Sequence, residues 1–358
     1  MQLENRKPDF SSQKIFIGID VHKKSWTVTI RNNQLALKTF SMNPSPEELI
    51  KYMKAHYPGG EYYSVYESGF CGYWIDKKLT MGGIKNIIVN AADVPTMNKE
   101  KLNKRDRIDS RKLARELESG SLTGIYIPGE IEEQIRTLSR LRFQLVGNRA
   151  QVKNRIKSLL NYYGEKIPEE YEAMNWTSRF IEHLRSEVLK DKMIPQESLH
   201  ILIEELDDNQ KRIKKVLKQM VQYSQEYGFN TTIKNLKSIP GISTITSMTI
   251  YSEIMNIDRF KSLDELACFV GLVPAVYGSG EKEKVLGLSN RHNRYLRNML
   301  IESAWVAVRK DPALTLKYSE LIRRMSKQEA IIRIAKKLLN RIRFVWKNNT
   351  CYSFALVA

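Results

Sequence analysis

The sequence of 358 residues lacks the features that mark membrane-bound, secreted and zinc-binding proteins. It contains no run of about 18 apolar residues, the length that a membrane-spanning helix needs. Its first residues, MQLENRKPDFSSQK, contain no apolar stretch of the signal-peptide kind. Its three cysteines form no CxxC pair, so neither a zinc site nor a disulfide framework is predicted. These absences favour a protein of the reducing cytoplasm.

Positive charge is present in large excess. Lys and Arg number 58 against 40 Asp and Glu, which gives a formal net charge of +18. The excess is clustered, because residues 279–350 contain 17 basic and 6 acidic side chains and residues 131–160 contain 7 and 2. Clustered Lys and Arg side chains can neutralise neighbouring phosphates and release their counterions, which strengthens binding to nucleic acid. The sequence contains no aromatic-rich amphipathic segment that would suggest binding to a membrane surface instead. An ordinary basic soluble protein is the alternative, but the clustering favours a nucleic-acid partner.

The first part of the chain, residues 1–125, predicts a mixed α/β domain. Three short β-branched runs separated by polar turns are typical of a meander, and helical and strand patterns alternate after them. The resulting order βββαβαβα is that of a sheet of the ribonuclease-H type. The predicted strands cover residues 14–20, 25–30, 35–40, 62–66 and 84–89, and the predicted helices cover residues 46–57, 74–79 and 106–117.

Residues 126–230 predict a long helical region. Apolar residues follow a 4-3 spacing over residues 131–160 and again over residues 197–223. Two long amphipathic helices of this kind predict a helical hairpin or coiled coil, and two core helices of a bundle are an equally good interpretation. Arg142 and Arg149 interrupt the first apolar stripe. Their charges would be unfavourable in a helix interface that excludes water. We expect them to face nucleic acid or a partner chain.

Residues 231–358 predict a mostly α domain. Pro240 and Gly241 form a tight turn between two helical stretches, as in helix-hairpin-helix modules that hold a phosphate on backbone N–H groups. A plain turn between helices is the alternative. Ser279 lies between two glycines, which would let a substrate approach but would also suit a flexible turn. Three arginines that repeat every three residues along a predicted helix are candidates for nucleic-acid contacts: Arg291, Arg294 and Arg297.

Four carboxylates are the main candidates for catalysis. Asp20 ends the first predicted strand and Glu67 the fourth, so both are expected at the same end of neighbouring strands. Asp106 and Asp109 are three residues apart, so a helix puts them on one face. Hard divalent cations bind where several carboxylate oxygens converge, and two such ions can assist phosphoryl transfer. A turn residue or a solvated helix start would explain each carboxylate singly, but the combination predicts a Mg²⁺ site.

Basic residues crowd the third and fourth carboxylates. A site that holds a phosphodiester beside acidic ligands needs cations nearby, although a surface loop could carry them for solubility. The candidates for nucleic-acid contacts in this stretch are Lys104, Arg105, Arg107 and Arg111.

The motifs GIDVHK, YESG, KRDRIDSRKLA, IPGI, FVGLVP, GSGEK and NRYLRNMLIESAW occur in this order. Together they resemble the DEDD insertion-sequence transposases, which are the bridge-RNA-guided recombinases, over roughly residues 14–350. The resemblance implies a RuvC-like N-terminal domain with Asp20, Glu67, Asp106 and Asp109 as metal ligands. It also implies a C-terminal domain whose serine, Ser279 by position, bonds covalently to DNA. A structured guide RNA is implied as well, together with a homo-oligomer, a dimer or a tetramer, whose active sites are shared between subunits.

Two positions depart from the family pattern, and neither departure removes a proposed catalytic group. His292 stands where a glycine is expected, and Gly278 stands where the serine is often doubled. The leading hypothesis is a recombinase that exchanges DNA strands with metal and serine. The alternatives are a RuvC-like structure-selective nuclease that uses metal-activated water, and a basic binding protein without activity. Concentrated negative charge would not help a pure binding surface beside phosphate, so the last alternative is disfavoured.

Overall fold

The computed structural model describes residues 9–96, 106–172, 176–188, 195–279 and 282–354. The chain forms two compact units, Met1–Ile127 and Pro128–Ala358. Within the second unit, the predicted boundary near residue 230 stays a prediction.

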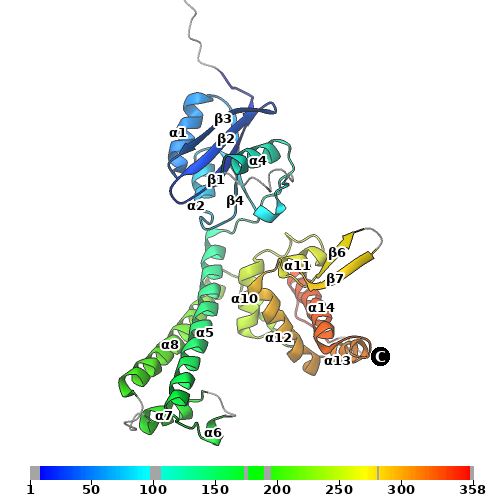
Figure 1. Ribbon diagram of the computed structural model, residues 1–358. Coiled ribbons are helices and arrows are strands. Elements are labelled where there is room, and N and C mark those ends of the chain that lie inside the picture. The colour runs from blue at the N-terminus through cyan, green and yellow to red at the C-terminus, as the bar shows by residue number, and fades with distance from the viewer. Residues whose placement is uncertain (1–8, 97–105, 173–175, 189–194, 280–281, 355–358) are drawn as a thin grey trace, which may run out of the picture. The chain divides into compact units, whose positions relative to one another are not determined.

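The first unit contains a five-stranded mixed sheet (Figure 1). Its strand order is β3-β2-β1-β4-β5, with β1 antiparallel to β2 and parallel to β4. The expected mixed α/β class and element order are therefore confirmed, and the sheet is consistent with a ribonuclease-H-like domain. The strands are β1 (Lys14–Val21), β2 (Trp26–Asn32), β3 (Leu35–Met42), β4 (Glu61–Glu67) and β5 (Lys85–Val89).

Helices of the first unit bury the apolar residues of the sheet. Alternate residues of β1, such as Ile15, Ile17 and Ile19, are fully buried in one cluster with residues of α1 and α2. Ser45 begins α1 by accepting a hydrogen bond from the Glu48 amide at 3.1 Å. The helical elements are α1 (Pro46–His56), α2 (Trp74–Met81), the short 3₁₀ turn η1 (Ala91–Asp93) and α4 (Asp106–Glu118).

Helix α4 lies directly against the backbone of β1 at Gly18. A Cβ atom at this position would lie 2.1 Å from the Ser110 carbonyl oxygen and 2.4 Å from the Ala114 nitrogen. The buried Ser110 hydroxyl also hydrogen-bonds the Thr29 hydroxyl at 2.9 Å. Only glycine permits so close an approach, so Gly18 determines how near α4 comes to the sheet.

The second unit begins with two long helices that lie side by side, α5 (Glu130–Tyr162) and α8 (Gln196–Glu226) (Figure 1). They are antiparallel, because Ile135 near the start of α5 packs with Met220 near the end of α8, and Ile156 near the end of α5 packs with Ile203. The two predicted long helices therefore pair within one chain. A coiled-coil supertwist and pairing between subunits stay predictions. The described residues between them include the short helices α6 (Glu169–Glu172) and α7 (Ser178–Ser186).

The remainder of the second unit packs six helices around one apolar core and adds a β-hairpin that the sequence analysis did not predict. The hairpin pairs β6 (Pro274–Ser279) with β7 (Lys282–Leu288) in antiparallel register. The helices are α9 (Asn230–Lys237), α10 (Thr244–Ile254), α11 (Leu263–Val270), α12 (Arg294–Lys310), α13 (Pro312–Leu321) and α14 (Lys327–Lys347).

The turn at Pro240 and Gly241 packs against α12. Gly241 has a positive φ of 89°, and a Cβ atom there would lie 2.4 Å from the Ser303 carbonyl oxygen. The positive φ and the close contact with α12 therefore explain why glycine occupies this position. A phosphate-holding role for this turn stays a prediction.

Candidate metal centre

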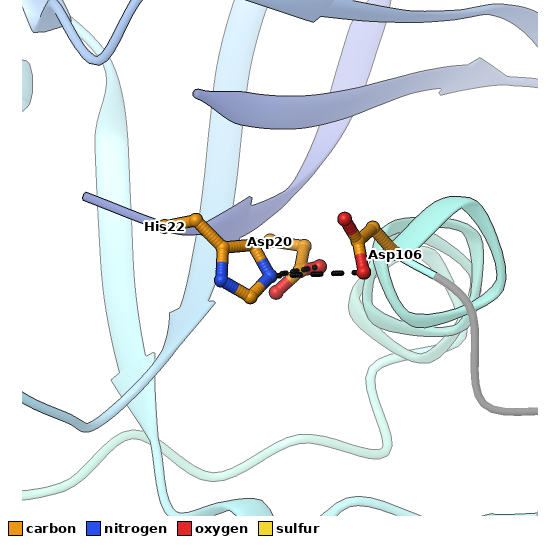
Figure 2. Close-up of side chains that lie close together, drawn as sticks. All are labelled: Asp20, His22 and Asp106. Atoms are coloured by element: carbon orange, nitrogen blue, oxygen red, sulfur yellow. Dashed lines mark hydrogen bonds and ion pairs between the residues drawn. The ribbon is translucent and has the colours of Figure 1, made fainter. Parts of the chain in front are cut away.

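The end of β1 and the start of α4 bring Asp20 and Asp106 together (Figure 2). His22 lies between them, with its Nε2 atom 3.1 Å from Asp20 Oδ2 and 3.7 Å from Asp106 Oδ1. One ligand atom from each of the three side chains lies within 4.8 Å of the others. His22 was not among the site residues predicted from the sequence. Imidazole nitrogens and carboxylate oxygens are both metal ligands, so the three side chains form an acidic cluster that could hold a cation.

Glu67 and Asp109 form the other part of the carboxylate set. The parallel register of β1 and β4 places Ile19 opposite Tyr66, so Asp20 and Glu67 follow at the same end of adjacent strands. The ammonium of Lys112 lies 3.7 Å from Glu67 and 3.3 Å from Asp109. Lys112 is buried. It therefore neutralises two carboxylates inside the unit.

The pKa of Asp20 shows that these carboxylates influence one another. Burial is the first cause that raises the pKa of this carboxyl above its ordinary value, and the charges of Asp106 and Asp109 raise it further. His22 acts in the opposite direction through its charge and its hydrogen bond. A divalent cation would relieve the repulsion, so the oxygen-rich donor set fits a hard metal ion.

The basic residues predicted near this cluster have different environments. Arg107 is exposed, and Arg111 donates from Nε to the Thr39 hydroxyl at 3.2 Å. Lys104 and Arg105 lie outside the described residues. Arg107 and Arg111 therefore remain the candidates for phosphate contacts that the structure describes.

Ser279 is the last residue of β6 and pairs in register with Lys282 of β7. It belongs to the unit Pro128–Ala358, whereas the four carboxylates belong to the unit Met1–Ile127. The four carboxylates thus share one unit, and the predicted nucleophile lies in the other.

Of the three arginines near α12, Arg297 hydrogen-bonds to the backbone of the protein itself. Its Nη1 atom donates to the carbonyl oxygens of Ser289 at 2.7 Å and Gly271 at 3.3 Å, and burial lowers its pKa. Arg294 is exposed and donates to the Tyr295 hydroxyl. Arg291 and His292 are exposed too. Arg297 holds the chain between β7 and α12, so it is less suited than Arg294 to binding phosphate.

A buried glutamate of α10, Glu253, also fixes this part of the chain and was missed by the sequence analysis. Arg140 of α5 binds its two carboxylate oxygens at 2.7 and 2.9 Å, and Asn293 donates to Oε2 at 2.8 Å. Asn293 in turn caps α12, because its side-chain oxygen accepts from the amides of Tyr295 and Leu296. The network joins α5, α10 and α12, and its residues are far apart in the sequence.

The two arginines of α5 that the sequence singled out are Arg142 and Arg149. Arg149 donates to the Gln210 side chain at 3.0 Å. Arg142 is half-buried, with an Nε–H that has no acceptor among the described residues. Burial and the charge of Arg149 lower its pKa. Neither arginine is paired with a carboxylate in the described parts of the chain.

No helix in the described ranges is long and apolar enough to cross a membrane. Two family profiles match the sequence. A DEDD profile of IS110 type, described as "Transposase", matches residues 17–164, and one described as "Transposase IS116/IS110/IS902 family" matches residues 233–319.

Several relatives are described as transposases. The putative transposase y4qE of Sinorhizobium fredii is 25% identical over 82% of this chain and 72% of its own length. The transposase for insertion sequence element IS1111A of Coxiella burnetii is 29% identical over 66% of this chain and 65% of its own length. The transposase for IS1328 of Yersinia enterocolitica is 24% identical over 58% and 59%. With the ribonuclease-H-like sheet, the acidic cluster and both profiles in sequence order, the chain belongs to the IS110 family of DEDD-type insertion-sequence transposases, which are DNA-recombining enzymes.

Proposed function

We propose that the chain cleaves and exchanges DNA strands at a metal centre held by Asp20, Glu67, Asp106 and Asp109, with Ser279 as nucleophile. The observation that supports the proposal best is the meeting of Asp20 and Asp106 from separate elements, with one ligand atom of each within 4.8 Å of the other. Mg²⁺ is the expected ion because the donors are mainly carboxylate oxygens. When bound, such an ion neutralises phosphate charge and polarises the attacking oxygen.

The proposed serine step exchanges one phosphate ester bond for another. Ser279 Oγ forms a bond to phosphorus, the bond from phosphorus to the leaving nucleotide oxygen breaks, and the serine proton ends on that oxygen. A serine hydroxyl needs activation at neutral pH, so the proposal requires the carboxylate unit to act together with Ser279 in the working assembly. The family resemblance adds a homo-oligomer and a structured guide RNA that selects double-stranded DNA targets. In this view residues 1–125 are catalytic, residues 126–230 pair subunits, and residues 231–358 supply the serine.

The decisive experiment traps the reaction in denaturant and maps any protein–DNA adduct. Wild-type protein with Mg²⁺ should form an adduct on the peptide that contains Ser279, and Ser279→Ala should form none. Ser289→Ala is a matched control at the other end of the hairpin and should still form the adduct. If Ser279→Ala forms the adduct, the serine is wrongly assigned.

A structure-selective nuclease that uses water remains the second candidate, because it needs only the four carboxylates. It predicts strand cleavage without an adduct in the active wild type. Replacing Asp20 with Asn should abolish cleavage in both cases while nucleic-acid binding persists. Full cleavage by Asp20→Asn would contradict both candidates.

A further inference from the structure

A pocket of about 400 Å³ lies near the end of the α5–α8 hairpin, remote in sequence from the four carboxylates and from Ser279. Helix α5 contributes Arg149 and Lys153 to its lining, helix α8 contributes Lys211 and Lys214, and Trp176 precedes α7. The pocket therefore combines four cations with one large aromatic ring.

The cations of this pocket are poorly neutralised. The one acidic lining residue, Asp207, is already paired with Arg185, and Lys211 lies 3.5 Å from Asp208. Within the described ranges, Arg149, Lys153 and Lys214 have no carboxylate partner. The pKa of Lys153 is lowered by burial first and then by the charges of Arg149 and Lys157. Like charges held together in this way favour an anionic ligand.

Trp176 supplies a rigid flat surface beside these cations. Its backbone has a positive φ of 61°, which bulky residues rarely adopt. Its ring packs edge-on against Phe180 with centroids 5.3 Å apart, and the Lys153 ammonium lies 5.3 Å from the ring centroid. Phe180 thus packs against the ring, and the Lys153 ammonium lies over its face.

We propose that this pocket binds one unpaired nucleotide of a single-stranded nucleic acid, with the base stacked on Trp176 and the adjoining phosphate held by Lys153, Arg149 and Lys214. Stacking of a base on an aromatic ring is stronger than an exposed cation–π contact. A base can therefore displace the Lys153 ammonium, which then meets the phosphate. A duplex keeps its bases stacked inside and offers only phosphate to the pocket.

The inference rests on the proposed function only in taking nucleic acid as the partner, and it does not involve the metal centre. The test uses the full chain and short single strands that contain 5-iodouridine or its deoxy equivalent, with ultraviolet cross-linking and mass spectrometry of the peptides. Wild type should cross-link at Trp176. Asp20→Asn should cross-link equally, so failed cleavage and failed nucleotide binding are distinguishable. Absence of a cross-link at Trp176 in both the RNA and the DNA arm would overturn the proposal.

Binding measurements with substituted chains give a second, independent readout. Trp176→Ala should weaken single-strand binding about ten-fold and leave binding to a duplex of the same sequence unchanged, whereas Trp176→Phe should retain most affinity. Lys214→Ala should weaken binding more than Lys215→Ala, its exposed neighbour outside the pocket lining.

Comparing the RNA and DNA single strands also identifies which nucleic acid occupies the pocket. Tighter RNA binding would identify a guide RNA as the occupant, and tighter DNA binding would identify an opened DNA strand; either result supports the pocket. An equal loss for single strand and duplex in Trp176→Ala would overturn it. So would an unchanged single-strand affinity.

Discussion

Asp20 precedes the last residue of β1 and has a carboxyl group whose burial opposes ionisation. Its folded-state pKa lies above the ordinary aspartate value of about 3.9. Its contribution to stability is therefore fully present below that ordinary value and is lost as the pH rises through the raised pKa. Without metal, the ionised cluster opposes folding at neutral pH.

We expect Asp20→Asn to melt at a higher temperature than wild type at neutral pH in the presence of a chelator, because the substitution removes this ionised carboxylate. The difference should shrink as the pH falls toward 4. Adding Mg²⁺ should raise the melting temperature of wild type and not that of the variant. Thermal melts across pH measure all three effects, and a pH-independent difference would contradict the electrostatic cause.

The ammonium group of Lys112 lies near the carboxylates of Glu67 and Asp109, whose negative charges it balances. Lys112→Met should lower the free energy of unfolding of the metal-free protein by about 1–3 kcal/mol, since two carboxylates lose a charged partner. Saturating Mg²⁺ should reduce this loss by supplying charge.

Lys78→Met is the matched control for this measurement. It breaks a pair with Glu47 in which both side chains are at least half exposed, so its cost should be about 0–1 kcal/mol and independent of metal. Denaturant titrations with and without Mg²⁺ separate the two behaviours. Equal losses for Lys112→Met in both conditions would show that the lysine has only a packing role.

At the scale of elements, the contact between β1 and α4 positions the acidic cluster. Gly18→Ala should push α4 from the sheet, because the new methyl group would overlap the backbone of Ser110 and Ala114. We expect a loss of roughly 1–3 kcal/mol or more, together with a loss of the Mg²⁺-dependent rise in melting temperature. A variant that keeps the full metal response would show that α4 can be displaced without disturbing the ligands.

Gly147 provides the contrasting case in the middle of α5. A Cβ atom there would meet nothing within 4 Å in the described chain. Gly147→Ala should therefore raise the free energy of unfolding by about 0.5–1 kcal/mol, as expected for an exposed helical glycine. A destabilised Gly147→Ala protein would indicate an unseen neighbour at this surface.

Elements with a strong periodic pattern could be predicted from the sequence, and isolated ones could not. The alternating residues of β1 and the apolar stripes of α5 and α8 repeat often enough to identify strand and helix. The β6–β7 hairpin offers only short runs broken by glycines, so the pattern around Ser279 was equally compatible with a plain turn.

The candidate site was predictable to the same degree. The four carboxylates stood at strand ends or on one helix face, which a sequence reveals. Three contacts depend on partners that only folding brings near: His22 with Asp106, Lys112 with Glu67, and Glu253 with a residue 113 positions away. The motif GIDVHK contained His22, and its spacing of two from Asp20 was the available signal.

For the whole molecule, the net charge of +18 does not mean that every cation binds nucleic acid. Arg341 pairs with the buried Asp311 at 2.7 Å, and Arg297 bonds to backbone carbonyls. Basic side chains thus divide into those that hold the fold and those free to meet phosphate.

This division gives different expectations for two arginines on one helix. Arg294→Ala should reduce the slope of log affinity against log salt concentration by about 0.9, the value for one lost phosphate contact. Arg297→Ala should mainly lower the melting temperature and leave the slope near its wild-type value. Binding titrations at several salt concentrations, with melts in parallel, test both. A slope change in Arg297→Ala with normal stability would reverse the assignment.

The β6–β7 hairpin forms a sheet of only two strands, so each strand has one edge with no neighbour in that sheet. A ribbon of this size gains little stability of its own in water, and its outer amides should exchange quickly with deuterium in the free protein. A ligand that stiffens the ribbon would slow the exchange and fix the position of Ser279 at the same time. If Ser279 is the nucleophile that we propose, cutting would begin only after the correct strand had been resident long enough to order the ribbon, so that target selection would depend on timing as well as on affinity.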